Sequence, residues 1–282
     1  MLLALVATVL AILAAQVLPV VHWRQRALAW WPHWLGLLGR QSAWGWLLAL
    51  ALPLLLLGLL QWLLDGLLFG VPEVLFSVLV LVLCWGPRDL ERDVEAMMYA
   101  DDAASQEQAR AALQADMNEP DRDSAPITQV VAVALLRRAL GVMFWFIVLG
   151  PVGALGYRLL ASASTQTAPL DLAAHERLRA ALALVEWPVA QLAVFSFALM
   201  GNCSPVVRTW QGQGRWQAPS LEGLLGAAMG AALPLPSAAE ADGELPVWER
   251  LPTLRRAMRL SWRTLGLWCA LMLFWQVAAW LG

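Results

Sequence analysis

The sequence predicts an all-α polytopic membrane protein with about six transmembrane helices, a cytoplasmic helical hairpin and interfacial amphipathic helices. Of its 282 residues, 60% are hydrophobic and only 14% are charged, and the mean hydropathy is +0.61. A soluble domain carries about 25% charged residues, so this composition places the chain in the membrane class. Six segments reach or approach the roughly 20 apolar residues that a membrane-spanning helix needs.

The six predicted spans belong to one membrane domain that covers the whole chain, residues 1–282. They are residues 1–21, 44–64, 71–86, 139–160, 180–200 and 261–282. The first segment has no positive charge before its apolar run, so we interpret it as a retained span rather than a cleaved signal. All 19 basic residues are arginines, and sixteen of them fall on one side, in the loops and at the start of the last span. The positive-inside rule then predicts that both termini lie outside.

The loop after the first span is expected to lie in the membrane surface. Trp23, Trp30 and Trp34 fall at helical spacing on one face, while the arginines of the segment point elsewhere. This is the pattern of an interfacial amphipathic helix, although packing against the spans would produce it too. Pro32 should break or kink this helix.

Residues 87–131 form the main polar segment and are predicted to fold as a cytoplasmic helical hairpin. Leu90 and Val94 lie on one apolar stripe of its first helix. A second helix is expected to begin with Ser105 as its N-cap. Gln108 follows three residues later and completes a capping box.

The charged residues of the first hairpin helix are the candidates for docking a protein partner. They are Arg88, Glu91, Arg92 and Glu95. Asp89 and Asp93, four residues apart, share a helix face, but a hard cation needs several converging carboxylates. The interleaved arginines favour solvated ion pairs instead. We therefore predict no metal site and favour docking of a protein.

A second cytoplasmic loop is predicted over residues 204–260. Its small apolar segment, residues 223–232, is expected to be a packed or re-entrant helix. A basic amphipathic helix then leads into the last span. Its arginines are Arg255, Arg256, Arg259 and Arg263. They suit anionic lipid headgroups, and orientation of the last span explains them equally well.

Glu186 is the outstanding polar residue within a predicted span, and it is followed by Trp187-Pro188. An ionisable group inside a span is a candidate for function. We expect its partner to be Arg158 or Arg179. Glu186, Arg158 and Gln191 are therefore candidates for sensing a ligand or signal. A buried pair that joins the fourth and fifth spans is the alternative.

Several kinds of chemistry are excluded or disfavoured. The chain has no lysine, which excludes a Walker A lysine and a Schiff-base lysine. Cys84, Cys203 and Cys269 are widely spaced, so we expect three small buried side chains rather than a disulfide framework. No catalytic residues, cofactor or nucleic-acid partner are predicted. The lipid bilayer is an expected partner, and a small-molecule ligand is unknown.

The segment FWFIVLGPVGALGYR, residues 144–158, resembles the membrane segment of AmpE proteins. The matching residues are Arg137, Phe144-Trp145, Gly150-Pro151, Gly153 and Gly156-Tyr157, together with Ala109-Arg110 and Glu186-Trp187-Pro188. The order of these elements fits across nearly the whole chain. The resemblance implies a bacterial inner-membrane protein, and the outside location of the termini that the positive-inside rule predicts is then the periplasm. It also implies a non-enzymatic modulator of β-lactamase induction and of the response to cell-wall damage.

AmpE proteins are in turn similar to CobD/CbiB proteins, which are membrane synthases of cobalamin biosynthesis. Those enzymes carry a polar, acid-containing segment just before the Phe-Trp pair. Here the same place reads ITQVVAVALLRRALGVMFW and contains no acid, which disfavours the amide-forming synthase or makes the chain a remnant of one. A small transporter is the other alternative, but no inverted repeat is visible.

The regulatory hypothesis gives roles to two parts of the chain. A periplasmic or membrane-level signal would alter the fourth and fifth spans, and the hairpin would relay it to a cytoplasmic partner. Arg137 and Arg138 are expected to anchor the cytoplasmic end of the fourth span. The Gly-Pro-x-Gly of this span is expected to allow close helix packing.

Overall fold

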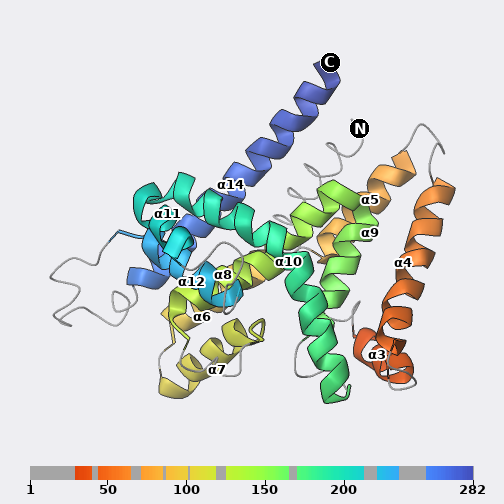
Figure 1. The fold of residues 1–282 in the computed structure, drawn as a ribbon, viewed down its shortest axis with the longest axis horizontal. Helices are drawn as coiled ribbons and strands as arrows, with labels where there is room; N and C mark the ends of the chain where they lie inside the picture. The colour runs from red at the N-terminus through yellow and green to blue at the C-terminus, as the bar shows by residue number, and fades with distance from the viewer. Residues whose placement is uncertain are drawn as a thin grey trace. The chain divides into compact units, whose positions relative to one another are not determined.

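The computed structural model describes residues 29–39, 44–64, 71–84, 87–100, 102–118, 125–164, 170–212, 221–234 and 252–281. Every regular element within these residues is a helix (Figure 1), so the predicted all-α class is confirmed. The predicted first span lies outside the described residues, as does the start of the predicted interfacial segment.

The chain forms two compact units, each made of segments that are distant in sequence. Unit 1 comprises Met1–Gly86, Gly141–Val185 and Cys269–Gly282, and unit 2 comprises Pro87–Leu140 and Glu186–Trp268. Two long helices, α10 and α14, contribute residues to both units. Their bounds are Leu172–Met200 and Pro252–Leu281.

Unit 1 is built on four helices besides its parts of α10 and α14. They are α3 (Trp31–Gly39), α4 (Gly45–Leu64), α5 (Val71–Cys84) and α9 (Gly141–Ala163). Helix α3 packs against α4, where the indole Nε1 of Trp34 donates to the carbonyl of Ala49 at 3.1 Å. Helix α9 packs against both α4 and α5. Pro32 lies in the first turn of α3, where a proline is tolerated.

Helix α9 is sharply bent at Gly150, whose φ of +66° lies in a region that favours glycine. In a straight helix, Gly141 and Tyr157 would be about 24 Å apart. Here a Cβ atom at Gly141 would overlap the Tyr157 ring, so the two halves of α9 fold back on each other. The predicted fourth span, residues 139–160, is therefore bent rather than straight.

Unit 2 contains the polar part of the chain. Its helices are α6 (Pro87–Met98), α7 (Ala103–Gln114), α8 (Ile127–Leu135), the π-helix η3 (Leu136–Leu140), α11 (Cys203–Gly212) and α12 (Leu221–Ala232). Helices α6 and α7 pack against each other and against α8. Leu90 and Val94 are each 1% exposed, which confirms the predicted apolar stripe.

Helices α8 and α12 are in close contact. A Cβ atom at Gly226 would lie 2.8 Å from the Cα atom of Gln129, so only glycine allows this approach of the two backbones. Glu222 is one turn before Gly226 on the same helix and is buried. The glycine contact thereby holds the Glu222 carboxylate inside unit 2.

Three helical segments among the described residues are long and apolar enough to cross a membrane. They are Gly45–Leu64, Ile127–Ala163 and Leu172–Met200. They overlap the predicted spans 44–64, 139–160 and 180–200. Helix α5 is a shorter apolar helix of 14 residues, and several side chains near the end of α14 lie outside the described part. The six-span count therefore remains a prediction.

Two local predictions were wrong. Helix α7 begins after Asp102, whose Oδ1 accepts from the backbone N–H of Ser105 at 2.8 Å, so Asp102 rather than Ser105 is the N-cap. Of the three cysteines that were expected to be buried, Cys203 is exposed and Cys269 is only partly buried. Arg137 and Arg138 lie inside a helical run that begins at Ile127, and their place at the cytoplasmic end of the fourth span stays a prediction.

Candidate functional site

Two adjacent arginines in the π-helix η3 are the centre of the candidate site. Arg137 and Arg138 are 5% and 7% exposed, which is rare for charged side chains unless they are paired. Short π-helical segments inside α-helices are uncommon and frequently occur at functional sites. The two side chains face different parts of unit 2.

Arg137 forms a two-point ion pair with Glu186 of α10. Its Nε and Nη2 atoms donate to Oε1 and Oε2 of Glu186 at 2.7 and 3.0 Å. This parallel arrangement is the strongest geometry for an arginine and a carboxylate. The Arg137 Nη1 atom also donates to the backbone carbonyl of Asp116. Glu186 itself is 1% exposed, so both charges are removed from solvent.

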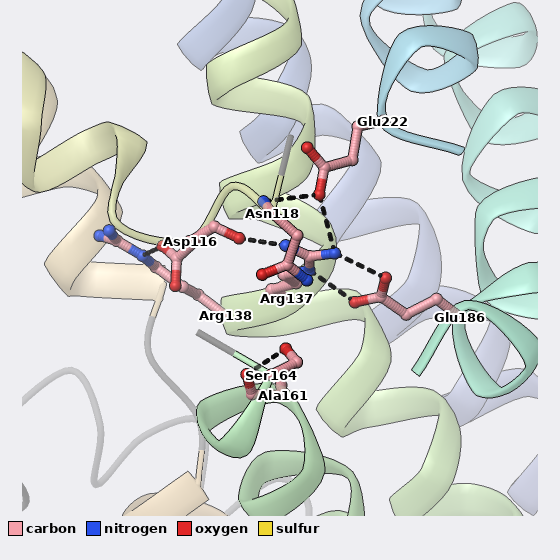
Figure 2. Close-up of polar contacts among 8 residues, drawn as sticks. All are labelled: Asp116, Asn118, Arg137, Arg138, Ala161, Ser164, Glu186 and Glu222. Atoms are coloured by element: carbon pink, nitrogen blue, oxygen red, sulfur yellow. Dashed lines mark hydrogen bonds and ion pairs between the residues drawn. The ribbon is translucent and has the colours of Figure 1, made fainter. Parts of the chain in front are cut away.

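Glu222 of α12 is the second carboxylate at Arg137. Its Oε1 atom lies 3.0 Å from Nη2 of Arg137 and accepts a hydrogen bond of 3.0 Å from the backbone N–H of Asn118. Figure 2 shows the Arg137 guanidinium between Glu186 and Glu222, while Arg138 points away from them toward Asp116. One guanidinium therefore joins α10, α12 and the segment after α7.

Arg138 pairs with the two polar helices instead. Its Nη1 and Nε atoms are each 2.5 Å from a carboxylate oxygen, the first of Asp93 in α6 and the second of Asp116 after α7. Its Nη2 atom donates to the carbonyl of Ala112 at 3.1 Å. Arg138 therefore attaches the α6–α7 pair to η3.

These six charged residues form one network, which we call the arginine–carboxylate cluster. Its members are Asp93, Asp116, Arg137, Arg138, Glu186 and Glu222. Two guanidinium groups face four carboxylates, so the formal charge is −2. The donors of both arginines are already directed at acceptors of the protein itself. The cluster therefore does not fit an anionic ligand.

The cluster also differs from a metal centre. Among the residues that the structure describes, no group of three or more His, Cys, Asp or Glu side chains could hold a metal ion. What the geometry does provide is electrostatic contact between helices. A buried charge that loses its partner is strongly destabilising, so separation of Glu186 from Arg137 would be costly.

The predicted partner of Glu186 was wrong. The structure pairs Glu186 with Arg137, whereas Arg158 lies in α9 and Arg179 in the part of α10 that belongs to unit 1. Within the described part of the chain, the buried Nε atoms of Arg158 and Arg179 have no hydrogen-bond partner. Arg158 is therefore not the partner of Glu186 that the sequence predicted.

Gln191 lies one turn beyond Glu186 in α10 but has a different environment. Its Oε1 atom accepts a hydrogen bond of 2.8 Å from the indole Nε1 of Trp210 in α11. The Trp210 ring lies 5.4 Å from that of Phe195. Gln191 therefore anchors α11 to α10.

The predicted docking residues of α6 are divided between surface and core. Arg92 and Glu95 are exposed, Glu91 is half-buried, and the side chain of Arg88 lies outside the described part. Asp93, between them, points into the arginine–carboxylate cluster. One helix therefore carries an exposed charged face and an internal contact to Arg138.

Glu222, Asp116 and Asn118 were not identified from the sequence as parts of a site. Glu222 precedes a run of small apolar residues, and Asp116 follows several other acids. The available signal was the Arg137-Arg138 pair itself, because two arginines inside a continuous apolar helix require buried acidic partners.

A comparison with protein families matches residues 37–213 of the chain to the model described as "Regulatory signalling modulator protein AmpE". This match covers more than half of the chain, and it includes Arg137, Arg138 and Glu186. A search of curated proteins found no match, and neither did a search of solved structures.

Proposed function

Because the chain belongs to the AmpE family of regulatory signalling modulators, we propose that it modulates β-lactamase induction and the response to cell-wall stress in the bacterial inner membrane, without catalysis. The observation that carries the proposal is the connection made by two adjacent arginines. Arg137 contacts Glu186 in the fifth predicted span, and Arg138 contacts Asp93 in the predicted hairpin.

The proposed mechanism is a relay through the arginine–carboxylate cluster. A signal that shifts or rotates α10 changes the position of Glu186. Arg137 follows, because a buried ion pair with two hydrogen bonds is costly to separate. Arg138 is the next residue in η3, so the same movement displaces its contact with Asp93 and changes the presentation of α6. The exposed residues Arg92 and Glu95 then bind or release a cytoplasmic protein.

The test compares matched surface variants in cells that lack the native gene. Arg92→Ala/Glu95→Ala should abolish the effect on β-lactamase induction, with the protein present in the membrane at normal levels. The control, Glu107→Ala/Arg208→Ala, also removes one acid and one arginine at exposed positions, and should retain the effect. Normal induction with the first variant would overturn the docking role of α6.

Glu186→Gln tests the internal half of the relay. This change keeps the size of the side chain but removes the charge that faces Arg137, so induction should lose its response to a β-lactam while the protein still folds. If only protein abundance fell, in proportion to the lost induction, Glu186 would have a structural role. Growth of a cobalamin auxotroph on this protein would overturn the non-catalytic proposal.

The proposed orientation places both termini in the periplasm and the hairpin in the cytoplasm. Single cysteines at positions 115 and 170, in a variant without the native cysteines, should react with a membrane-impermeant reagent from opposite sides. Labelling from the same side would show that residues 139–160 are re-entrant, as the bend at Gly150 allows, and would overturn this orientation.

A further inference from the structure

The exposed face of the first half of α14 carries a stripe of arginines. Arg255, Arg259 and Arg263 follow one another at intervals of four residues, which places them on one side of a helix. Trp262 lies beside them and is 38% exposed. The opposite side packs into unit 2 through buried residues, among them Leu254, Ala257, Ser261, Leu265 and Trp268. We call the four exposed residues the arginine stripe of α14.

The arginines of this stripe have no acidic residue on their own helix to neutralise them. The sequence from residue 252 to the end of the chain contains no Asp or Glu. Within the described part of the chain, no ion pair or hydrogen bond engages the exposed guanidinium groups of Arg259 and Arg263. A guanidinium group binds phosphate oxygens through two parallel hydrogen bonds. The stripe is therefore chemically suited to phosphate groups.

The position of the stripe along α14 indicates which phosphates it meets. From Arg255 to Arg263 the helix rises about 12 Å. Trp262 lies at the end of this basic segment, and indole rings are enriched where a membrane meets water. Farther along the same helix, Leu271 and Phe274 are 56% and 73% exposed. The helix thus changes from arginine through tryptophan to exposed apolar residues, in the order of headgroups, interface and acyl chains.

We propose that the arginine stripe of α14 binds the phosphate groups of anionic phospholipids. An acidic protein would satisfy the arginines equally well, but the exposed apolar residues that follow on the same helix favour lipid. The binding would hold the first half of α14 at the membrane surface. This inference does not depend on the regulatory function proposed above, because none of these residues belongs to the arginine–carboxylate cluster.

The experiment measures bound lipid on the purified full-length protein in neutral detergent by native mass spectrometry. The protein is titrated with short-chain phosphatidylglycerol and, separately, with short-chain phosphatidylcholine. Phosphatidylglycerol should bind more tightly than phosphatidylcholine. Each basic residue near a membrane contributes about 1 kcal/mol, which is roughly fivefold in affinity. Arg259→Gln/Arg263→Gln should therefore weaken binding of phosphatidylglycerol by about 30-fold.

Two further variants make the result specific. Arg92→Gln/Arg208→Gln removes the same charge from exposed positions on α6 and α11, outside the stripe, and should leave lipid affinity within about twofold. Arg259→Lys/Arg263→Lys keeps the charge but loses the two-point hydrogen bonds, so its affinity should lie between those of the unchanged protein and of Arg259→Gln/Arg263→Gln. This variant also reports on folding, because it changes the same positions.

Three outcomes would overturn the proposal. In the first, the Arg259→Gln/Arg263→Gln variant binds phosphatidylglycerol as tightly as the unchanged protein. In the second, the control variant loses as much affinity as the stripe variant, so that net charge rather than the stripe determines binding. In the third, inorganic phosphate at the concentration of the lipid displaces phosphatidylglycerol, which identifies a site for a soluble anion instead of a membrane surface.

Discussion

Replacement of Arg137 should have a larger effect on stability than replacement of either acid that it contacts. In the Arg137→Met variant, the carboxylates of Glu186 and Glu222 lose the guanidinium that faces both of them. Their side chains are 1% and 7% exposed, so water does not replace the lost cation. Removing one partner of a buried ion pair costs about 3–5 kcal/mol, and here one substitution affects two carboxylates. We therefore expect a loss of at least about 4 kcal/mol.

Glu186→Gln should lower the free energy of unfolding by less than Arg137→Met does. The variant keeps an oxygen that accepts from Arg137, and Glu222 remains 3.0 Å from the same guanidinium. The amide has one acceptor oxygen where the carboxylate has two, so one of the two hydrogen bonds from Arg137 is lost. A hydrogen bond that involves a charged group contributes about 1.5–3 kcal/mol. The expected loss is therefore about 1.5–3 kcal/mol, smaller than that of Arg137→Met.

A triple variant separates the charge effect from simple loss of contacts. In Arg137→Met/Glu186→Leu/Glu222→Gln the cation and both negative charges are absent, and the amide introduced at position 222 still offers an acceptor to the N–H of Asn118. Replacing buried ionic groups by apolar ones is often neutral or stabilising. The triple variant should consequently be more stable than Arg137→Met alone.

The assay is the free energy of unfolding in mixed detergent and dodecyl sulfate micelles, followed by far-ultraviolet circular dichroism, with gel filtration as the check for a monodisperse starting state. The reasoning is refuted if Glu186→Gln is as destabilised as Arg137→Met. It is also refuted if the triple variant is less stable than Arg137→Met, because the two carboxylates left without their cation would then not be the source of the loss.

Three other predictions concern backbone and capping positions. Gly150→Ala should destabilise the bend of α9 by about 1–3 kcal/mol, measured in the same unfolding assay, because a φ of +66° strains any other residue. Gly226→Ala should cost about 1–3 kcal/mol by overpacking against α8, whereas the control Gly230→Ala, with its nearest neighbour atom at 3.6 Å, should cost much less. Hydrogen bonding from Ser105 holds the pKa of the Asp102 carboxyl below its ordinary value of 3.8. Its contribution to α7 is therefore complete above that value and is lost as pH falls through the lowered pKa. Asp102→Ala should speed amide exchange at the start of α7 at neutral pH, and equal exchange in the two proteins there would contradict this.

Local patterns predicted those parts of the fold that depend on neighbours in sequence. The apolar run of α4 is long enough to cross a membrane by composition alone. The spacing of Leu90 and Val94 identified the buried face of α6, because residues four apart share a side of a helix. The resemblance to AmpE proteins rested on the order of several weak motifs, and the family match over residues 37–213 confirms it.

Contacts between distant residues could not be predicted in this way. Arg137 and Glu186 are 49 residues apart, and nothing local distinguishes Arg137 from Arg158 or Arg179 as the partner. The positive-inside rule also predicted that Arg137 and Arg138 face lipid headgroups rather than buried acids, since it assigns arginines near apolar runs to the headgroup region. Asp102 and Ser105 are both good N-cap residues, so composition could not decide which of them begins α7.

The proposed relay depends on the adjacency of the two arginines. Successive side chains of a helix point in different directions. The ion pairs of Arg137 are with α10 and α12, and those of Arg138 are with α6 and the end of α7. Both arginines also contact Asp116, Arg137 at its backbone carbonyl and Arg138 at its carboxylate. In the proposed mechanism, a rotation of η3 that shortens one set of ion pairs lengthens the other, and such an exchange between two sets of contacts is one way in which a signalling element switches.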